Sequence, residues 1–565
     1  MDTRSSYSRF ACVGTGVSGI GLGASLKRWY DEGDIRFFDR STQPCGTWSI
    51  NKYPGCACDV PSVLYSLSYE PNTEWSRVLP TNIEIERYLL GVARKYDLLS
   101  KMSLGVEVRE CRWIEKSKRW RLEVCHLESK TVFQHECSVL FSAAGQLVYP
   151  REPDIPNIDN FKGQVFHSAR WDQSADLKDK DVIVIGNGCT ASQIVPAIVD
   201  ETRSLTQIVR SKHWVFPPID FPYPTWLKWA FKNIPLLQWT HRMQIFCLAE
   251  WEFQTFPMTA RAARMRSTRR KTVEGYMRDT APAKYHDLLI PDFDIGCKRR
   301  IYDSGYLKSL HSDKLTLTNA KALEFVPEGI RTTDGIVKAD VVVLANGFRT
   351  NEFMSPLNII GKNGELLVDH WKAAGGPEAY NCSAMNGFPN FFMILGPNTA
   401  TGHTSTIMAS ENSINYALRI LKPFMYDNVQ SVEVKREAET SYTDKIQSGL
   451  QKTVWNSGCT SWYIRAVEKG SPTWNAMTYP YTQGYYWYRC LFPIWKDWKL
   501  LPTSRKKRFW DIFQFFAILS FFPKRRAAAW TAPVLNDSRT RIPAKSWVIR
   551  FRSAASRNML FIMCS

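Results

Sequence analysis

The chain has 565 residues, of which 44% are hydrophobic and 22% charged, a balance typical of a globular protein with two or three domains. Its net charge of +19 lies mainly at the C-terminal end, because residues 499–565 contain 14 Lys and Arg but only 2 Asp and Glu. No recognisable nucleic-acid-binding module accompanies this charge, so the sequence does not indicate a nucleic-acid partner.

The first residues contain no apolar run of the kind found in secretion signals, and we therefore expect a cytoplasmic protein. In that compartment the 14 cysteines are expected to be thiols, most of them small buried side chains. Cys56 and Cys58 form a C-x-C pair, but no second pair completes a zinc site, so we expect no metal.

A short apolar strand, a glycine-rich turn and an apolar-periodic helix open the chain. The turn contains Gly14, Gly16 and Gly19, which allow a tight bend, room for a pyrophosphate and close helix packing. The helix N-terminus then faces the phosphates. A second strand ends at Asp39, where a carboxylate can bind ribose hydroxyls. This order of elements predicts a dinucleotide site.

The same pattern recurs after the strand at 181–185. Its turn and helix start contain Gly186, Gly188, Thr190 and Ala191. The next strand ends at Arg210, 24 positions after Gly186, whereas Asp39 follows Gly14 by 25 positions. An acid at this place repels a 2′-phosphate and an arginine accepts one. We therefore expect FAD at the first site and NADPH at the second.

These elements predict an α/β fold with two Rossmann-like dinucleotide-binding domains, the NADPH domain being inserted into the FAD domain. The buried strand in residues 339–348 marks the expected return to the FAD domain. The expected ranges are 1–150 and 341–498 for the FAD domain, 151–215 and 291–340 for the NADPH domain, 216–290 for a helical insertion, and 499–565 for a tail.

Two motifs resemble signatures of the flavin-dependent Baeyer–Villiger monooxygenases. The F-x-G-x-x-x-H-x-x-x-W-[P/D] signature is matched by Phe161, Gly163, His167, Trp171 and Asp172. A second signature is matched by Gly46, Trp48, Tyr53, Pro54, Gly55 and Asp59, with Cys45 in place of the usual Gly or Ala. Residues 296–306, 387–405 and 454–463 also resemble family segments, and the resemblance spans roughly residues 8–500.

The resemblance implies an enzyme that uses NADPH and O2 to oxidise a ketone to an ester or lactone through a C4a-peroxyflavin. It implies that Arg299 stabilises the negative charge of that reaction, and that Asp59 orients Arg299 and contacts the cofactors. Residues implied for the 2′-phosphate are Arg210, Ser211 or Lys212, and Lys298. Residues implied for lining the flavin are Thr47, Trp48 and Tyr65. The first signature is implied to be a linker that coordinates the movements of the cofactors.

Other functions remain open at this point. A flavin disulfide reductase is disfavoured, because the FAD half has no C-x-x-C or C-x-x-x-x-C pair. A flavin monooxygenase that hydroxylates, epoxidises or oxidises nitrogen or sulfur is the main alternative. A cofactor-binding protein without turnover, held at a membrane, is a further one. The aromatic residues of 216–290 favour a bulky apolar ketone of the secondary-metabolite kind, although core packing would explain them equally well.

The tail contains an apolar run of 14 residues from Phe509 to Phe522, shorter than the roughly 20 residues that span a bilayer. Its basic flanks suit a segment that lies on an anionic membrane surface, and a helix packed on the protein body is the alternative. The sequence does not indicate the oligomeric state.

Overall fold

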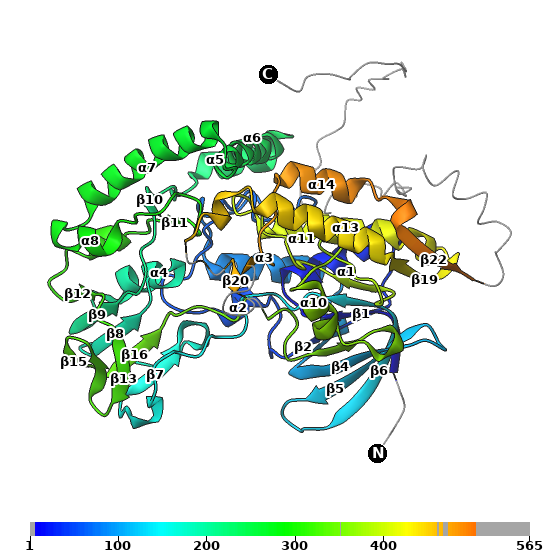
Figure 1. Ribbon diagram of the computed structural model, residues 1–565, viewed down its shortest axis with the longest axis horizontal. Coiled ribbons are helices and arrows are strands. Elements are labelled where there is room, and N and C mark those ends of the chain that lie inside the picture. The colour runs from blue at the N-terminus through cyan, green and yellow to red at the C-terminus, as the bar shows by residue number, and fades with distance from the viewer. Residues whose placement is uncertain (1–5, 351, 460, 462, 467–472, 504–565) are drawn as a thin grey trace, which may run out of the picture. The chain divides into compact units, whose positions relative to one another are not determined.

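The computed structural model describes residues 6–503 apart from 351, 460, 462 and 467–472 (Figure 1). Its largest sheet has the strand order β17-β4-β5-β6-β1-β2-β3, and β18 also pairs with β6. The strands are β1 (Ser6–Val13), β2 (Ile35–Asp39), β3 (Met102–Leu104), β4 (Val106–Ile114), β5 (Arg119–His126), β6 (Val132–Ser142), β17 (Asn358–Ile360) and β18 (Phe391–Met393). Strand β1 is parallel to both β2 and β6, as a dinucleotide-binding unit requires.

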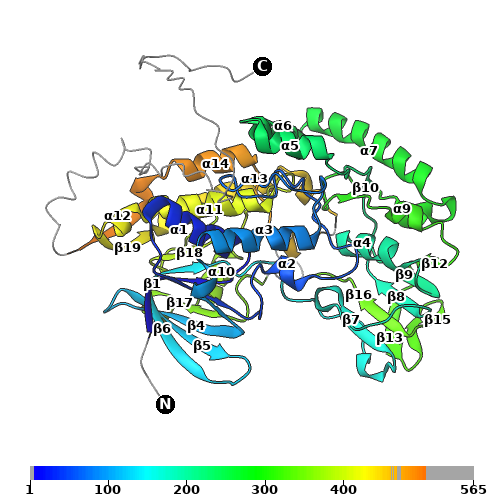
Figure 2. The same ribbon diagram turned by 180° about the vertical axis from the view of Figure 1, so that it is seen from behind.

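Helices from both ends of the chain pack on this sheet (Figure 2). They are α1 (Val17–Tyr30), α2 (Thr47–Ile50), α3 (Asn82–Lys95), α10 (Leu367–Ala374), α11 (Thr406–Ile420), α12 (Lys422–Met425), α13 (Arg436–Leu450) and α14 (Gln483–Leu491). Helix α3 begins at a capping box in which Thr81 and Glu84 satisfy each other's backbone N–H groups. The largest apolar core lies between the sheet and α11 and α13.

The second sheet is entirely parallel, with the order β12-β9-β8-β16-β7. Its strands are β7 (Gln164–His167), β8 (Asp181–Ile185), β9 (Ser204–Ile208), β12 (Leu315–Thr318) and β16 (Val341–Leu344). Helices α4 (Cys189–Ile198) and α9 (Tyr306–Ser309) belong to this half, as does an antiparallel sheet of β13 (Ala322–Val326), β14 (Gly329–Thr332) and β15 (Gly335–Lys338). The two parallel units confirm the predicted α/β class.

The expected boundary at residue 341 is wrong in one respect. Strand β16 does not return to the first sheet; it is the fourth of the five strands of the second, between β8 and the edge strand β7. Its four residues are all buried. An apolar strand of this kind has the same sequence character in either parallel sheet, so the sequence did not show which sheet would accept it.

The stretch expected to be helical contains α5 (Thr225–Asn233), α6 (Leu237–Glu252), α7 (Ala260–Thr280) and α8 (His286–Leu289). Strands β10 (Val215–Phe216) and β11 (Ile301–Tyr302) pair where the chain enters and leaves it. Helix α7 begins at Thr259, whose side chain accepts from the N–H of Ala262.

The expected tail begins too early. Strand β22 (Trp498–Pro502) pairs with β19 (Val429–Val434), so residues 499–502 belong to the folded body. A short pair, β20 (Arg465–Ala466) and β21 (Thr473–Trp474), precedes it. The apolar run Phe509–Phe522 lies outside the described residues. Among the residues that are described, no helix has the length and apolar character needed to cross a membrane.

Candidate active site

The two glycine turns are equivalent in three dimensions. Gly14 and Gly186 both adopt a positive φ, +108° and +122°, which side chains rarely tolerate. A Cβ on Gly14 would lie 2.3 Å from the carbonyl oxygen of Ala143, and one on Gly186 would lie 2.4 Å from that of Ala345. Each turn therefore packs against the end of the neighbouring strand and could not accept another residue without rearrangement.

The helices that follow the two turns lack side-chain caps. The N-caps of α1 and α4 are Gly16 and Gly188, and neither makes a side-chain hydrogen bond to its helix. The first N–H groups of both helices are therefore accessible to an anion, as in other phosphate-binding turns. Thr190 lies in the first turn of α4, and Ala191 is buried where the first unit has Gly19.

Asp39 ends β2 beside the first glycine turn. Its Oδ2 accepts from both the N–H and the hydroxyl of Thr15, at 2.7 Å each, and its Oδ1 accepts from the N–H of Ser41 at 2.9 Å. The carboxylate thus ties the turn to the end of the second strand. Its contact with a ribose stays a prediction.

The segment of the second signature lies against the same turn. The N–H of Cys45 donates to the carbonyl of Thr15 at 3.1 Å. Cys45 has φ +79°, a left-handed conformation that explains why glycine suits this place in the signature. Thr47 starts α2, and the indole of Trp48 donates to the hydroxyl of Tyr65 at 3.1 Å with the two rings nearly perpendicular.

Arg299 and Asp59 form a two-fold ion pair. Arg299 Nε lies 2.8 Å from Asp59 Oδ2, and its terminal nitrogen lies 2.6 Å from Oδ1. The carboxylate raises the pKa of Arg299 well above its usual range, so the guanidinium keeps its charge at any working pH. The Arg299 side chain is 34% exposed. The Arg299 guanidinium is thus a fixed cationic group, held by Asp59, that a ligand can still reach.

The neighbouring arginine faces the other way. Arg300 donates to Glu252 of α6 at 2.9 Å, and its guanidinium lies over the rings of Phe216 and Tyr302. Arg269 of α7 pairs with the same carboxylate. Arg300 therefore secures the helical insertion, which leaves Arg299 as the arginine beside Asp59.

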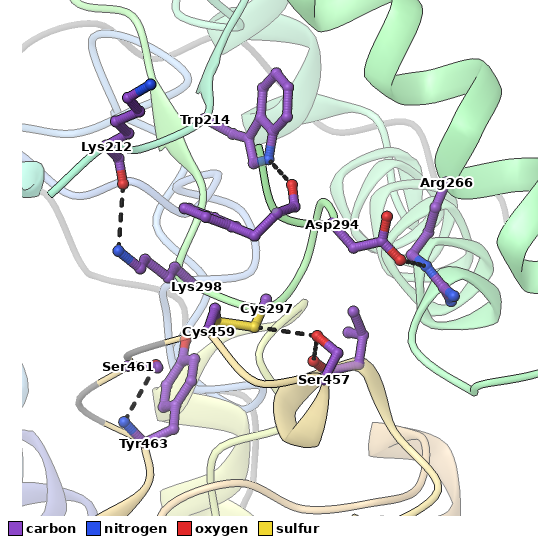
Figure 3. Close-up of a disulfide and its surroundings, with 12 residues drawn as sticks. Lys212, Trp214, Arg266, Asp294, Cys297, Lys298, Ser457, Cys459, Ser461 and Tyr463 are labelled. Atoms are coloured by element: carbon purple, nitrogen blue, oxygen red, sulfur yellow. Dashed lines mark hydrogen bonds and ion pairs between the residues drawn. A yellow bond between two sulfur atoms is a disulfide. The ribbon is translucent and has the colours of Figure 1, made fainter. Parts of the chain in front are cut away.

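Cationic side chains gather near the end of β9, where a 2′-phosphate is expected. Arg210 is 81% exposed and has a 3.7 Å ion pair with Asp154. Lys298 Nζ donates to the carbonyl of Lys212 at 3.3 Å (Figure 3). Burial and the charge of Arg210 lower the pKa of Lys298, so the two cations lie within electrostatic reach. Ser211 is held by a bond from Asn187 to its carbonyl oxygen.

The first signature forms an edge strand and the turn after it. Phe161 and Gly163 precede β7, and a Cβ on Gly163 would meet the Asp340 carbonyl at 2.3 Å. His167 ends β7; its Nε2 donates to the Gly347 carbonyl at 3.0 Å and its Nδ1 accepts from the N–H of Ala169. Burial lowers the pKa of this histidine, which favours the neutral ring.

Trp171 and Asp172 complete the signature. The Trp171 ring packs edge-on against Phe166 at 4.9 Å, within the core cluster that also contacts Tyr53. Asp172 accepts from the N–H and hydroxyl of Ser174. The spacing therefore reflects one strand and one turn that join the second sheet to the returning chain at residue 347.

A disulfide between Cys297 and Cys459 contradicts the expectation that all cysteines are thiols. Their Cα atoms lie 6.3 Å apart, and 162 positions separate them in the sequence (Figure 3). The bond fastens the residue before Lys298 and Arg299 to the 454–463 segment. No spacing rule relates two cysteines so far apart, so the sequence offered no signal for this pair.

Two further residues of the site were missed from sequence. Gln193 on α4 accepts from the Tyr53 hydroxyl at 3.0 Å and donates to the Ala57 carbonyl at 3.1 Å, which docks the Asp59 segment on the second unit. Tyr463 is buried and interacts electrostatically with Arg299. Tyr463 lies in a segment that resembles the family, so that resemblance could have identified it; Gln193 gave no signal.

One group in the described part of the chain has metal-ligand geometry, and it lies outside this site. His370, Glu378 and Glu439 are buried with ligand atoms within 4.8 Å of one another. His370 already pairs with Glu439 at 3.0 Å and with Glu365 at 3.1 Å, and Arg436 lies 3.6 Å from Glu439. These partners account for the group as a buried ion-pair network.

Comparisons with known proteins identify the family and the fold of the chain. A family model described as flavin-binding monooxygenase-like matches residues 7–238. A Baeyer–Villiger monooxygenase of Pseudomonas aeruginosa is 33% identical over 484 residues, covering 84% of this chain and 88% of its own. One of Streptomyces coelicolor is 32% identical over 478 residues, covering 84% and 89%. The crystal structure of OTEMO in complex with FAD and NADP has a TM-score of 0.77 at 22% identity and covers 88% of this chain and 100% of its own, which shows the same fold.

Proposed function

The chain belongs to the Baeyer–Villiger family of flavin-binding monooxygenases, and we propose that it uses FAD, NADPH and O2 to convert a bulky apolar ketone into an ester or lactone. The observation that carries the proposal is the Arg299 guanidinium, a permanently protonated and partly exposed group that Asp59 holds where segments of the two dinucleotide-binding units meet.

The residues present fit both cofactors. The first turn offers uncapped helix N–H groups from Gly16 onward and an acid, Asp39, at the end of the next strand. The second turn offers the same N–H groups and has Arg210 where the acid would be, with Lys298 within electrostatic reach of it. A carboxylate disfavours a 2′-phosphate and cations favour one. We therefore assign FAD to the first turn and NADPH to the second.

Bound flavin, reduced by NADPH, supplies the chemistry that activates O2. The task left to the chain is to stabilise the negative charge that develops on the ketone oxygen as the new bond forms. Arg299 suits this role because its guanidinium cannot lose its proton and Asp59 fixes its orientation. Asp59 is then a positioning residue that acts through Arg299.

We propose that the first signature, residues 161–172, maintains the relative position of the two dinucleotide-binding units during turnover. The His167–Gly347 bond joins the end of the edge strand to the chain that returns toward the first sheet. Trp171 and Tyr53 both pack against the core of the second unit, and Tyr53 also bonds to Gln193 on α4. A change in this segment would therefore move both cofactor sites relative to each other.

The test compares Arg299→Ala with Arg300→Ala, its neighbour on the opposite side. Each purified variant is loaded with FAD and given NADPH and a panel of cyclic, steroid and aromatic ketones, with product measured by gas chromatography and mass spectrometry. We expect Arg299→Ala to lose on the order of 10²–10³-fold in ester formation while retaining FAD, and Arg300→Ala to remain within about tenfold of the native rate. Equal losses in both variants would refute the role of Arg299, and oxidation of amines or sulfides without ester would favour the alternative oxygenation.

A further inference from the structure

Helices α5 and α6 present apolar side chains on both of their faces. On the inner side Leu227, Phe231, Ile245 and Phe246 pack against a core cluster of the first unit. The 16 residues of α6 include none that is fully buried. A helix that is apolar on both faces usually has a partner on each side. Only one side of α6 has such a partner within the described chain.

Helices α5 and α6 expose large apolar residues. On α6 these are Trp239, Leu248 and Trp251, and Leu236 lies just before the helix. Leu248 and Trp251 share one side of α6, whereas Trp239 lies about 120° round the helix from Trp251. On α5 the exposed residues are Trp226 and Trp229. Trp226 is 68% exposed, Trp251 58% and Leu236 73%. Figures 1 and 2 both show α5 and α6 side by side at the edge of the drawn helices. We refer to these six residues as the tryptophan face.

The exposed charge around the tryptophan face is positive. Residues 225–271 contain nine Lys and Arg and two Glu. Both acids have internal partners: Glu250 lies 2.8 Å from the His403 ring, and Glu252 pairs with Arg300 and Arg269. Lys232, Arg261 and Arg264 are among the exposed basic side chains of this stretch. Lys232 has one partner outside the stretch, Glu74 at 3.9 Å, whereas Arg261 and Arg264 have no ion pair among the described residues.

A hollow of about 400 Å³ adjoins the same face. Trp251 and Met265 line its apolar part, Arg264 lines its basic part, and Arg269 lines it together with its ion-pair partner Glu252. The apolar side chains beside Arg264 suit a group with an apolar chain and an anionic head. It joins the tryptophan face to the basic side of α7.

We propose that the tryptophan face docks on an anionic membrane surface. Indole rings favour the boundary between acyl chains and headgroups, and neighbouring Lys and Arg are attracted to anionic lipids. A second copy of this chain would bring the same positive charges together, which disfavours self-association through this face. The lipid surface satisfies both the exposed indoles and the excess positive charge.

Cys247 allows a direct test on the native face. It lies on α6 between Trp239 and Trp251 and is the exposed free cysteine of the described chain. A Cys564→Ser protein, labelled at Cys247 with an environment-sensitive nitrobenzoxadiazole probe, is mixed with phosphatidylcholine vesicles that contain or lack 30% phosphatidylserine. We expect a blue shift and stronger emission with the anionic vesicles, reduced by 0.5 M NaCl. No change at Cys247 would overturn the proposal. A Cys247→Ser protein labelled at Cys564 provides the comparison. A change of emission in that protein alone would overturn the proposal and favour membrane binding through residues 499–565.

A variant pair provides the second measurement. Trp226→Gln, Trp229→Gln and Trp239→Gln are combined, and Trp487→Gln, which alters an exposed tryptophan of α14, is the control. We expect the triple variant to lose at least tenfold in flotation with anionic vesicles and the control to match the native chain. FAD absorbance and circular dichroism verify that the variants fold. If the triple variant does not fold, the emission of the probe at Cys247 in the otherwise native protein tests the proposal by itself. Unchanged flotation, or a native dimer that the triple variant turns into a monomer, would overturn the proposal.

Discussion

Replacing Asp59 with Asn tests how the site holds Arg299. The substitution keeps the shape of the side chain, removes its charge and replaces one of two acceptor oxygens. The two bonds measure 2.8 and 2.6 Å, and bonds of this charged kind contribute about 1.5–3 kcal/mol. Arg299 is 34% exposed, so solvent screening favours the lower part of that range. We expect a loss of about 2 kcal/mol of transition-state stabilisation, which corresponds to roughly 30-fold in kcat/KM.

A double-mutant cycle isolates the contribution of the pair. The four proteins are the native chain, Asp59→Asn, Arg299→Ala and the double variant, assayed by NADPH-dependent ester formation at saturating NADPH. If Asp59 acts through Arg299, the double variant is no more than about threefold slower than Arg299→Ala alone. Fully additive losses would refute this reasoning, because they would give Asp59 a role independent of the guanidinium.

The remaining predictions concern the cofactor, pH and the disulfide. Arg210→Ala raises the KM for NADPH by about tenfold and changes that for NADH little, because an exposed cation is lost from the 2′-phosphate; steady-state kinetics with both cofactors will check this. Burial lowers the pKa of His135 to about 4, so protonation favours the unfolded chain, and stability falls as pH drops from about 6.5 to 4. His135→Gln should flatten the decrease in Tm over that window, and an unchanged slope would contradict the assignment. Cys459→Ser releases a closed loop of 162 positions, which the chain-entropy estimate values at up to about 5 kcal/mol. Its Tm should fall clearly and become insensitive to dithiothreitol, whereas Cys247→Ser should match the native chain.

The local features of the site were readable from the sequence. Glycine at a turn between a strand and a helix indicates a backbone conformation that side chains disfavour, and the structure shows the positive φ at Gly14 and Gly186. The contrast between Asp39 and Arg210 depends only on counting from those turns. The choice of Arg299 over Arg300 rested on resemblance, and the opposite partners of the two side chains agree with it.

The features that depend on contacts between distant segments were not readable. Strand β16 pairs with β8 and β7 in the second sheet. Its apolar sequence would suit either parallel sheet and does not encode that choice. The Cys297–Cys459 bond and the Gln193 bridge each link parts of the chain more than 130 positions apart. The exposure of the tryptophan face was likewise not predictable. The composition of a segment is the same whether its tryptophans are buried or exposed, and only the placement of the helices distinguishes the two.

Labelling with ¹⁸O₂ tests most directly whether this chain inserts one oxygen atom of O2 next to a ketone carbonyl. The native protein, FAD and NADPH are incubated with a ketone that it consumes, and the product is analysed by mass spectrometry alongside NADPH oxidation. We expect one ¹⁸O atom in the ester oxygen for each NADPH oxidised, with the carbonyl oxygen unlabelled. Hydrogen peroxide without ester, or label that appears only in an alcohol, epoxide, N-oxide or sulfoxide, would contradict it.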